Sequence, residues 1–399
     1  MKYVVLLPDG VSDLPVPALG DKTPLEAARH PNLDWIAKAG TAGWAKTIPD
    51  GFPPGSDVGC MSVFGYDPRT YHTGRAPLEA AAQGIRLARD EVAFRCNTVT
   101  VTDGVMADYS AGHIESAEAA ELIRAVNEAL GKNGVRFYPG VGYRHLMVIS
   151  GAEYAKTRCT PPHDISGQPT APHAPAGPGA EKLSELLCKA AGILKEHPVN
   201  QRRVKAGKPL ANQLWFWGQG TAAQLPPFKD VYGLRAACIS AVDIVRGIAR
   251  LAGMEILQVP GITGYFDTNY QGKAEHALAA LDEGFDLVVI HVESTDEAGH
   301  MGDAQKKIQA IEDVDRLVVG PVLEGLKRRG GPFAALVTPD HPTSVERRTH
   351  VAAPVPFARY ATGAPGAGAP AYNERSIPRH ARVMDGCAMM GELVGRTRS

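Results

Sequence analysis

The chain from residue 239 onward alternates short apolar runs with segments of helical periodicity. These segments lie in order at 241–251, 255–259, 273–281, 287–292, 304–328 and 333–338. Strands that alternate with helices favour a parallel sheet covered by helices. Near the N-terminus, the apolar run Tyr3–Leu7 stops at the turn residues of Pro8-Asp9-Gly10, which indicates another buried parallel strand.

The stretch between about residues 77 and 234 is organised differently. Its expected elements are strands at 92–101 and 145–149, helices at 116–130 and 180–196, and a loop rich in Pro, Gly and His at 159–179. Two domains are the usual outcome for 399 residues. We therefore predict an α/β sheet domain flanked by helices and formed by residues 1–76 and 235–399. A smaller α+β domain at 77–234 is inserted into it.

Smaller features complete the expected organisation. Residues 23–39 have the periodicity of a helix, and 41–48 are a second candidate strand in the N-terminal part. A Pro/Gly loop at 49–55 precedes a possible helix that starts at Ser56. The low-complexity segment 361–371 is expected to form a flexible surface loop.

Charge and cysteine usage exclude several classes of protein. Lys plus Arg is 42 and Asp plus Glu is 43, a balance without the positive surface that nucleic acid or an anionic membrane would require. The apolar run 285–292 is far too short to cross a bilayer, and the N-terminus lacks a signal-peptide layout. None of the six cysteines forms a CxxC pair, which suggests reduced thiols in a cytoplasmic protein.

Polar residues follow three of the expected strands. Asp9 follows the first strand, Asp296 and His300 follow the run that ends at 292, and Asp340 and His341 follow the run that ends at 338. Open α/β sheets bind ligands beyond the carboxyl ends of their strands. We therefore expect these side chains at one edge of one sheet.

The spacing of these residues suits divalent metal ions. In the sequence DEAGH, Asp296 and His300 are four residues apart, so a helical turn places both on one face. Carboxylates and imidazoles are ligands for ions such as Mn²⁺ or Zn²⁺. His350 follows shortly after His341 in the chain. Each of these residues alone is more often structural, and the ordered set is the specific signal.

Ser56 is the candidate nucleophile. It lies after the Pro/Gly loop, at the expected start of a helix. Serine in this position often serves only as an N-cap. A helix N-terminus also stabilises an anion, and a neighbouring metal ion can lower the pKa of a serine hydroxyl. The local sequence leaves both roles open.

These residues form part of a longer resemblance. The segments PDG at 8–10, GSDV at 55–58, DEAGH at 296–300, PDH at 339–341 and THVAAPVPF at 349–357 resemble the alkaline phosphatase superfamily. Within it, the chain is similar to the cofactor-independent phosphoglycerate mutases of the archaeal type. Further similar segments include YSAGHI at 109–114, FYPGVGYRHL at 137–146 and DTNYQGKAE at 267–275. The resemblance thus covers most of the chain and implies an alkaline-phosphatase-like sheet domain.

The resemblance implies two divalent ions, with Mn²⁺ favoured and Zn²⁺ or Mg²⁺ as alternatives. The ligands implied for the first ion are Asp9, Ser56, Asp340 and His341. Those implied for the second are Asp296, His300 and His350. Ser56 would become a phosphoserine while phosphoglycerate is isomerised in glycolysis or gluconeogenesis, and water would have to be excluded from it. Candidates for binding the substrate are Arg95, His113, Arg144 and Arg235.

Other functions share the same type of site. Some archaeal-type relatives are proposed homoserine kinases, and HPVN at 197–200 and TPPHD at 160–164 resemble that group. A phosphomonoesterase would use the same chemistry without excluding water. A binding module without catalysis would leave the ordered ligands and the candidate nucleophile unexplained. The resemblance therefore favours the mutase and keeps the kinase and the phosphatase as alternatives.

Overall fold

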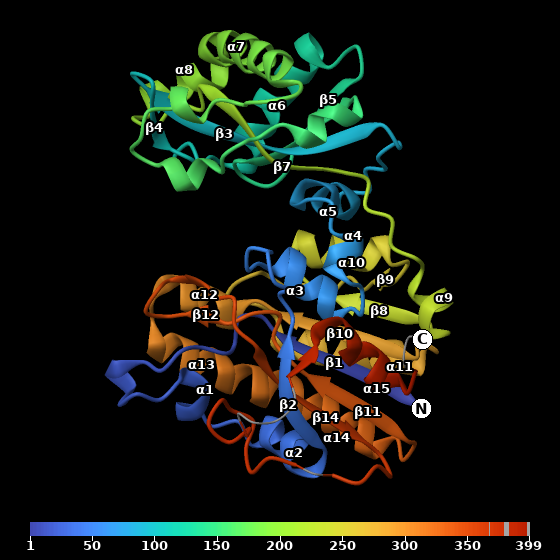
Figure 1. The fold of residues 1–399 in the computed structure, drawn as a ribbon. Coiled ribbons are helices and arrows are strands. Elements are labelled where there is room, and N and C mark those ends of the chain that lie inside the picture. The colour runs from blue at the N-terminus through green and yellow to red at the C-terminus, as the bar shows by residue number, and fades with distance from the viewer. Residues whose placement is uncertain (367, 379–382, 397–399) are drawn as a thin grey trace. The chain divides into compact units, whose positions relative to one another are not determined.

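The computed structural model describes residues 1–366, 368–378 and 383–396 (Figure 1). The chain forms two compact units, one from Met1–His72 with Gln224–Ser399 and one from Thr73–Ala223. The division after Ala223 lies earlier than the sequence suggested. Residues 224–234 belong to the first unit, in which the Tyr232 hydroxyl donates to the carbonyl of Gly65 at 3.2 Å.

The first unit contains an eight-stranded sheet. Its strands, in spatial order, are β15 (Val383–Asp385), β2 (Thr41–Lys46), β14 (Val355–Ala361), β11 (Phe333–Val337), β1 (Lys2–Pro8), β10 (Leu287–Val292), β8 (Ala236–Ile239) and β9 (Glu255–Ile256). The strands from β11 to β9 are parallel, as predicted. β14 was not predicted as a strand, and it runs antiparallel to both of its neighbours. The α/β fold class is confirmed.

Helices surround this sheet. They are α1 (Pro24–Ala27), α2 (Pro31–Ala39), α3 (Ser56–Val63), α4 (Pro68–Tyr71), α9 (Phe228–Tyr232), α10 (Asp243–Leu251), α11 (Tyr270–Asp282), α12 (Ser294–Met301), α13 (Ala304–Val314), α14 (Gly320–Arg328) and α15 (Met389–Val394). A two-stranded hairpin of β12 (Thr343–Ser344) and β13 (Thr349–His350) follows β11. None of the helices in the described part of the chain combines the length and the apolar character needed to cross a membrane.

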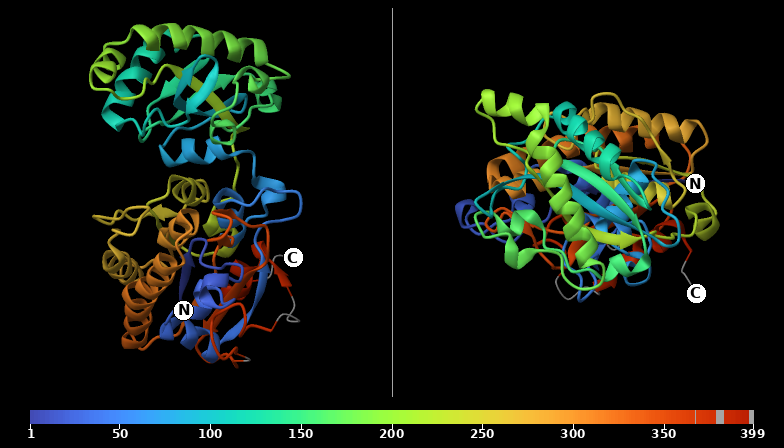
Figure 2. Two further views of the ribbon diagram at one scale, coloured as in Figure 1. Left: turned by 90° about the vertical axis from the view of Figure 1, so that its left-hand side faces the viewer. Right: turned by 90° about the horizontal axis from the view of Figure 1, so that it is seen from above.

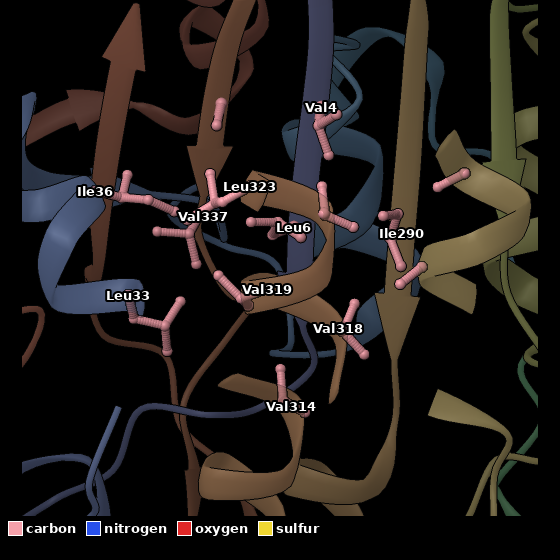
Figure 3. Packing of buried hydrophobic residues seen from close by; sticks show 14 of the residues in the cluster. Val4, Leu6, Leu33, Ile36, Ile290, Val314, Val318, Val319, Leu323 and Val337 are labelled. Atoms are coloured by element: carbon pink, nitrogen blue, oxygen red, sulfur yellow. The ribbon is translucent and has the colours of Figure 1, made fainter. Parts of the chain in front are cut away.

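Both faces of the sheet are buried. Val4 and Leu6 of β1 belong to one large apolar cluster, and their neighbours Val5 and Leu7, which alternate with them along the strand, are equally inaccessible. A strand covered on both faces has a continuous apolar sequence, which explains why β1 and β10 were recognised within a residue or so of their observed ends. Figure 3 shows Leu6, Ile290 and Val337 from three adjacent strands packed among helical side chains.

One predicted helix is interrupted. The segment 304–328 forms α13, a π-helical turn at Asp315–Val319 and then α14, which has Pro321 near its start. Proline has no N–H to donate to the preceding turn, so a regular α-helix cannot continue unchanged there. The Asp315 carboxylate, in turn, accepts hydrogen bonds from the backbone N–H of Leu33 at 2.7 Å and from the side chain of Asn32 at 2.8 Å, at the start of α2.

One further prediction needs correction, and another is met in part. The segment 23–39 forms two helices, α1 and α2, because Pro31 disfavours helical backbone at the preceding residue His30. The segment 361–371 was predicted to be a flexible surface loop, and its residue 367 lies outside the described residues. Within it, Ala369 is buried and its N–H donates to the carbonyl of Ala37 at 3.1 Å, so part of this loop packs on the end of α2.

The second unit is an antiparallel sheet with two long helices. Its elements are α5 (Arg75–Ala82), β3 (Glu91–Thr102), β4 (Val105–Asp108), α6 (Ser116–Leu130), β5 (Val135–Tyr138), β6 (Arg144–Ser150), α7 (Ala180–Glu196), α8 (Pro198–Lys205) and β7 (Gln213–Thr221). β3 pairs with β4, β6 and β7. Figure 2 shows α6 and α7 on the same face of this sheet, where Leu122 and Leu186 join Phe94 and Phe216 in one apolar core.

Candidate metal centre

The candidate ligands from the sequence converge at the carboxyl ends of three adjacent strands of the first unit. Asp9 directly follows β1, Asp296 lies in α12 just after β10, and Asp340 and His341 follow β11. All four side chains are at most 6% exposed. Parallel strands β11, β1 and β10 end at the same edge, so residues more than 300 positions apart become neighbours.

Ser56 joins this group through helix α3. Gly55 occupies the N-cap position and Ser56 is the first residue of the helix, so its hydroxyl does not cap the helix. The Ser56 Oγ lies 3.1 Å from the His341 Nε2. Gly59, one turn later, allows the approach, because a Cβ there would lie 2.4 Å from the backbone oxygen of Asp340.

The first group of potential ligands surrounds His341. Its Nε2 lies 3.2 Å from the Asp340 Oδ2 and 3.7 Å from the Asp9 Oδ1. The Asp9 Oδ1 is buried and has no hydrogen-bond partner among the described residues. A buried carboxylate oxygen without a donor is costly. A metal ion bound by this group would supply its missing partner.

The second group consists of Asp296, His300 and His350. The Asp296 Oδ2 lies 3.2 Å from the His300 Nε2, and its Oδ1 lies 3.5 Å from the His350 Nε2. The two Nε2 atoms are 2.9 Å apart. Asp296 also lies within ligand distance of Asp9 and His341, so it belongs to both groups.

The outer nitrogens of the two histidines face backbone carbonyls. His300 Nδ1 lies 3.1 Å from the oxygen of Arg348, and His350 Nδ1 lies 3.3 Å from the oxygen of Pro54. Each Nδ1 therefore donates its N–H, which leaves the two Nε2 atoms facing each other. Two facing lone pairs would repel, so a cation, either a proton or a metal ion, has to lie between them. The donor set of carboxylate oxygens and imidazole nitrogens fits Mn²⁺ or Zn²⁺.

The electrostatics of the centre are dominated by buried carboxylates. Burial, reinforced by the charges of Asp340 and Glu293, raises the pKa of Asp9 well above its usual range. Burial and the nearby Asp296 carboxylate raise the pKa of Glu293 to about 8. Burial also disfavours ionised Asp296, but hydrogen bonds from the histidines of its group outweigh this effect and hold its pKa well below the usual range. Such a concentration of negative charge favours divalent cations.

Burial has the opposite effect on the histidine nearest to Ser56. It lowers the pKa of His341, although the Asp340 carboxylate acts in the other direction. In the second group, desolvation disfavours the charged form of His300, but its hydrogen bond to Asp296 outweighs this and raises the pKa to about 9. A proton bound there occupies the position between the two imidazoles that a metal ion would take over.

The sequence did not reveal three residues of this centre. His291 is buried in β10, and its Nε2 donates to the Asp9 Oδ2 at 2.9 Å while its Nδ1 lies 3.1 Å from the Ser240 hydroxyl. Glu293 lies 3.6 Å from the same Nε2. His291 was recognisable in principle, because an imidazole inside the apolar run LVVIHV needs a polar partner. The third residue, Thr343, had no such signal.

The structure assigns the four substrate-binding candidates to different places. Arg235 precedes β8 and bonds through its backbone N–H to the Asp286 carboxylate at 2.9 Å. It belongs to the first unit and lies at the amino end of its strand, whereas the metal centre lies at the carboxyl ends. The structure therefore does not bring Arg235 to the centre, because the side chain lies over Phe285 at the opposite edge of the sheet.

The other three candidates belong to the second unit. Arg95 is buried, pairs with Glu79 at 3.0 Å and lies over the ring of Trp217 at 4.1 Å. The rings of His113 and Tyr143 are 6.2 Å apart, and the Arg144 guanidinium lies 5.5 Å from the Tyr143 ring.

An additional arginine joins this group. Burial, opposed by Glu79 and reinforced by the positive charges of Arg75 and Arg144, lowers the pKa of Arg95 to about 10. The buried Arg75 Nε has no hydrogen-bond partner among the described residues and lies 3.9 Å from the Glu79 carboxylate. His163, whose ring is 5.2 Å from that of Trp217, also feels the charges of Arg95 and Arg75. We call Arg75, Arg95, Arg144 and His163 the basic cluster.

Comparisons with known proteins agree with one another. Residues 37–200 match the profile of the family described as 2,3-bisphosphoglycerate-independent phosphoglycerate mutase. The protein of that name from Methanothrix thermoacetophila is 53% identical over 363 residues, which cover 91% of each chain. A probable enzyme of that name from Geobacter sulfurreducens is 50% identical over 99% of this chain and 100% of its own. The solved structure of the cofactor-independent phosphoglycerate mutase from Thermoplasma acidophilum has a TM-score of 0.68 at 30% identity, with 99% of both chains covered.

Proposed function

Because this chain belongs to the 2,3-bisphosphoglycerate-independent phosphoglycerate mutases of the archaeal type, we propose that its metal centre carries out the isomerisation. The chain is an isomerase that interconverts 2-phosphoglycerate and 3-phosphoglycerate in glycolysis and gluconeogenesis. The observation that carries the proposal for the centre is a buried serine hydroxyl beside two groups of carboxylate and imidazole ligands.

Two divalent ions would bind in these groups. The first would be held by Asp9, Ser56, Asp340 and His341, and the second by Asp296, His300 and His350. Mn²⁺ suits the mixed oxygen and nitrogen donors, and Zn²⁺ or Mg²⁺ are alternatives. When bound, the ions would lower the pKa of the serine hydroxyl and neutralise charge on the transferred phosphoryl group.

Ser56 carries the phosphoryl group between the two hydroxyls of glycerate. Its Oγ attacks the phosphorus of 3-phosphoglycerate, the bond from phosphorus to the C3 oxygen breaks, and the serine proton ends on that oxygen. The trapped glycerate then turns, and its C2 hydroxyl attacks the phosphoserine, whereupon Ser56 regains a proton. Water has to be excluded between the two steps, since it would hydrolyse the phosphoserine.

The inserted unit would bind the anionic groups of the substrate. We propose that the basic cluster, together with His113, contacts the phosphate or carboxylate, because guanidinium groups bind both in bidentate geometry. Support comes from Arg75 and Arg144, whose positive charges both act on Arg95. A group of like charges favours the binding of an anion. We propose that this unit also serves as the lid that keeps water from the phosphoserine.

A variant tests the role of the basic cluster. Arg144→Ala is expected to raise KM for phosphoglycerate more than it lowers kcat, because it removes a substrate contact and leaves Ser56 in place. Arg136→Ala is the matched control, since Arg136 lies in the same unit and pairs with Glu91. Equal KM values for the wild type and Arg144→Ala would remove Arg144 from the proposal.

The direct test of function is a coupled assay. The protein is incubated with 3-phosphoglycerate and Mn²⁺ in the absence of bisphosphoglycerate, and the 2-phosphoglycerate formed is measured through enolase. Turnover should disappear with a chelator and return with added Mn²⁺. Release of inorganic phosphate without isomerisation would indicate a phosphomonoesterase. Transfer of phosphate from ATP to homoserine would indicate the kinase alternative.

The cytoplasm is the proposed location. Phosphoglycerate is an intermediate of central carbon metabolism, and all six cysteines are free thiols. Reduced thiols are usual in the cytoplasm. Fractionation of the native organism, with detection of the protein in the soluble fraction, tests this proposal.

A further inference from the structure

Thr343 lies between the two groups of candidate metal ligands. Its side chain is completely buried at the start of β12. The hydroxyl oxygen is 2.5 Å from the Asp296 Oδ1 and 3.2 Å from the His341 Nδ1. A single hydroxyl thus contacts one ligand candidate of each ion.

Two glycines of the sequence motifs make room for this threonine. A Cβ on Gly10, in the segment PDG, would lie 2.3 Å from the Thr343 Oγ1. A Cβ on Gly299, in DEAGH, would lie 2.7 Å from the Thr343 Cγ2. Gly10 also has a φ of 58°, a conformation that favours glycine. The absence of side chains at two separate positions therefore serves the same threonine.

The hydroxyl proton of Thr343 has one hydrogen-bond acceptor among these partners. An ionised carboxylate only accepts hydrogen bonds, so the hydroxyl must donate to Asp296. The same oxygen can then only accept from His341, which requires the proton of that imidazole to be on Nδ1. The Nε2 lone pair consequently faces Ser56 and Asp340, which is the arrangement a ligating histidine needs.

The other two histidines are held in the same way by different partners. His300 and His350 direct Nδ1 to backbone carbonyls and Nε2 to the ligand groups. Among the described residues, His341 has the Thr343 hydroxyl as the hydrogen-bond partner of its Nδ1. The Thr343 hydroxyl therefore fixes the Nδ1 of His341, as backbone carbonyls fix the Nδ1 of His300 and His350.

The backbone of Thr343 is itself fixed. Its N–H donates to the Ser12 carbonyl at 3.1 Å, and its carbonyl accepts from the buried Lys307 Nζ at 2.5 Å. In the β12–β13 hairpin, Thr343 pairs with His350. Displacement of this residue would thus disturb ligands of both groups.

We propose that Thr343 is a positioning residue that selects the ligating tautomer of His341 and couples it to Asp296, so that the two metal positions depend on one hydroxyl. The inference rests on the proposed function only in that the two groups bind divalent ions. Loss of such an outer hydrogen bond typically weakens metal binding by about 10–100-fold.

The test compares Thr343→Val, which removes the hydroxyl at nearly constant shape, with Thr343→Ser, which keeps it. Calorimetric titration with Mn²⁺ should show affinity lower by about 10–100-fold in Thr343→Val and restored in Thr343→Ser. Thr100→Val is the control, because it removes a buried hydroxyl from the other unit, where Thr100 bonds to the Leu210 carbonyl at 2.6 Å. Thr343→Ala replaces the valine variant if that variant fails to fold.

A second measurement follows the tautomer directly. Nitrogen shifts of ¹⁵N-labelled histidine in the metal-free wild type should assign a protonated Nδ1 to His341, and the signal should change in Thr343→Val. Mn²⁺ affinity equal to that of the wild type, or a protonated Nε2 in the wild type, would overturn the inference. Neither measurement requires turnover, so a wild type without mutase activity would refute the proposed function and leave these results to decide on Thr343.

Discussion

Replacement of Ser56 by alanine separates its structural and chemical roles. The structural loss is small, because Gly55 rather than Ser56 is the N-cap and the Ser56 hydroxyl has His341 as its hydrogen-bond partner at 3.1 Å. One such bond contributes about 0.5–1.5 kcal/mol, and the better helix propensity of alanine offsets up to about 0.5 kcal/mol of that. We therefore expect the free energy of unfolding to fall by about 1 kcal/mol or less.

The chemical loss should be complete. Two other hydroxyls among the described residues are engaged elsewhere. Ser62 lies six residues later in α3, roughly 9 Å along the helix axis, and its hydroxyl donates to the Thr47 carbonyl at 2.6 Å. The hydroxyl of Thr343 is engaged by Asp296. The carboxylate and imidazole ligands remain, so most Mn²⁺ binding should survive.

Three measurements decide this prediction. The coupled assay should find no turnover in Ser56→Ala, while urea unfolding should remain close to the wild type and Mn²⁺ titration should still show binding through the remaining carboxylate and imidazole ligands. Wild-type protein quenched in acid after incubation with phosphoglycerate should carry a phosphoryl group on the peptide that contains Ser56. Ser62→Ala is the matched control in the same helix and should keep its activity. Normal turnover by Ser56→Ala would refute the covalent mechanism even if the metal groups bind as proposed.

The structure also predicts the size of the effect of three other substitutions on the free energy of unfolding. Gly59→Ala should lower the free energy of unfolding by about 1–3 kcal/mol and reduce turnover, because its Cβ would lie 2.4 Å from the Asp340 backbone oxygen and push α3 away; unchanged urea unfolding would contradict the close packing. Lys307→Met should cost about 3–5 kcal/mol in urea unfolding, since it leaves the Asp13 carboxylate, 2.9 Å from the Lys307 Nζ, buried without its cation. Burial raises the pKa of Glu374 from 4.5 to about 6. The contribution of Glu374 to the free energy of unfolding is therefore fully present below pH 4.5 and is lost as the pH rises through about 6. Glu374→Gln should remove roughly 2 kcal/mol of this pH dependence, and equal pH dependence in both proteins would show that Glu374 does not titrate as expected.

The sequence predicted the elements whose periodicity was unambiguous. The helices α6 and α7 have the predicted ends, and β10 matches its apolar run. Interruptions were missed where one residue opposes the local pattern, as Pro31 does between α1 and α2. β14 was missed because local periodicity reveals neither its pairing with β11 and β2 nor its antiparallel direction.

The candidate site shows the same division. Aspartate and histidine at strand ends carry a recognisable signal, because parallel strands bring their carboxyl ends together. Thr343 and Ser240 carry none, since a hydroxyl reveals its role only through the partners that surround it. Arg235 was selected because of the sequence around it. It lies at the amino end of β8, whereas the metal centre lies at the carboxyl ends of the strands. Sequence spacing thus predicted which candidate ligands lie together in the fold, but it did not predict the residues that contact them from outside, such as Thr343 and Ser240.

The acidity of the centre links metal binding to folding. Asp9, Glu293, Asp296 and Asp340 are gathered beside one another, and burial with mutual repulsion raises the pKa of both Asp9 and Glu293. The His291 Nε2, which donates to the Asp9 Oδ2 at 2.9 Å, offsets part of this repulsion. An ion that binds only the folded chain stabilises it in proportion to the logarithm of its concentration. The carboxylates that would bind the ions therefore lower the stability of the fold when no ion is bound. A hydroxyl such as that of Thr343 carries no charge, so it can orient these ligands without lowering the stability further.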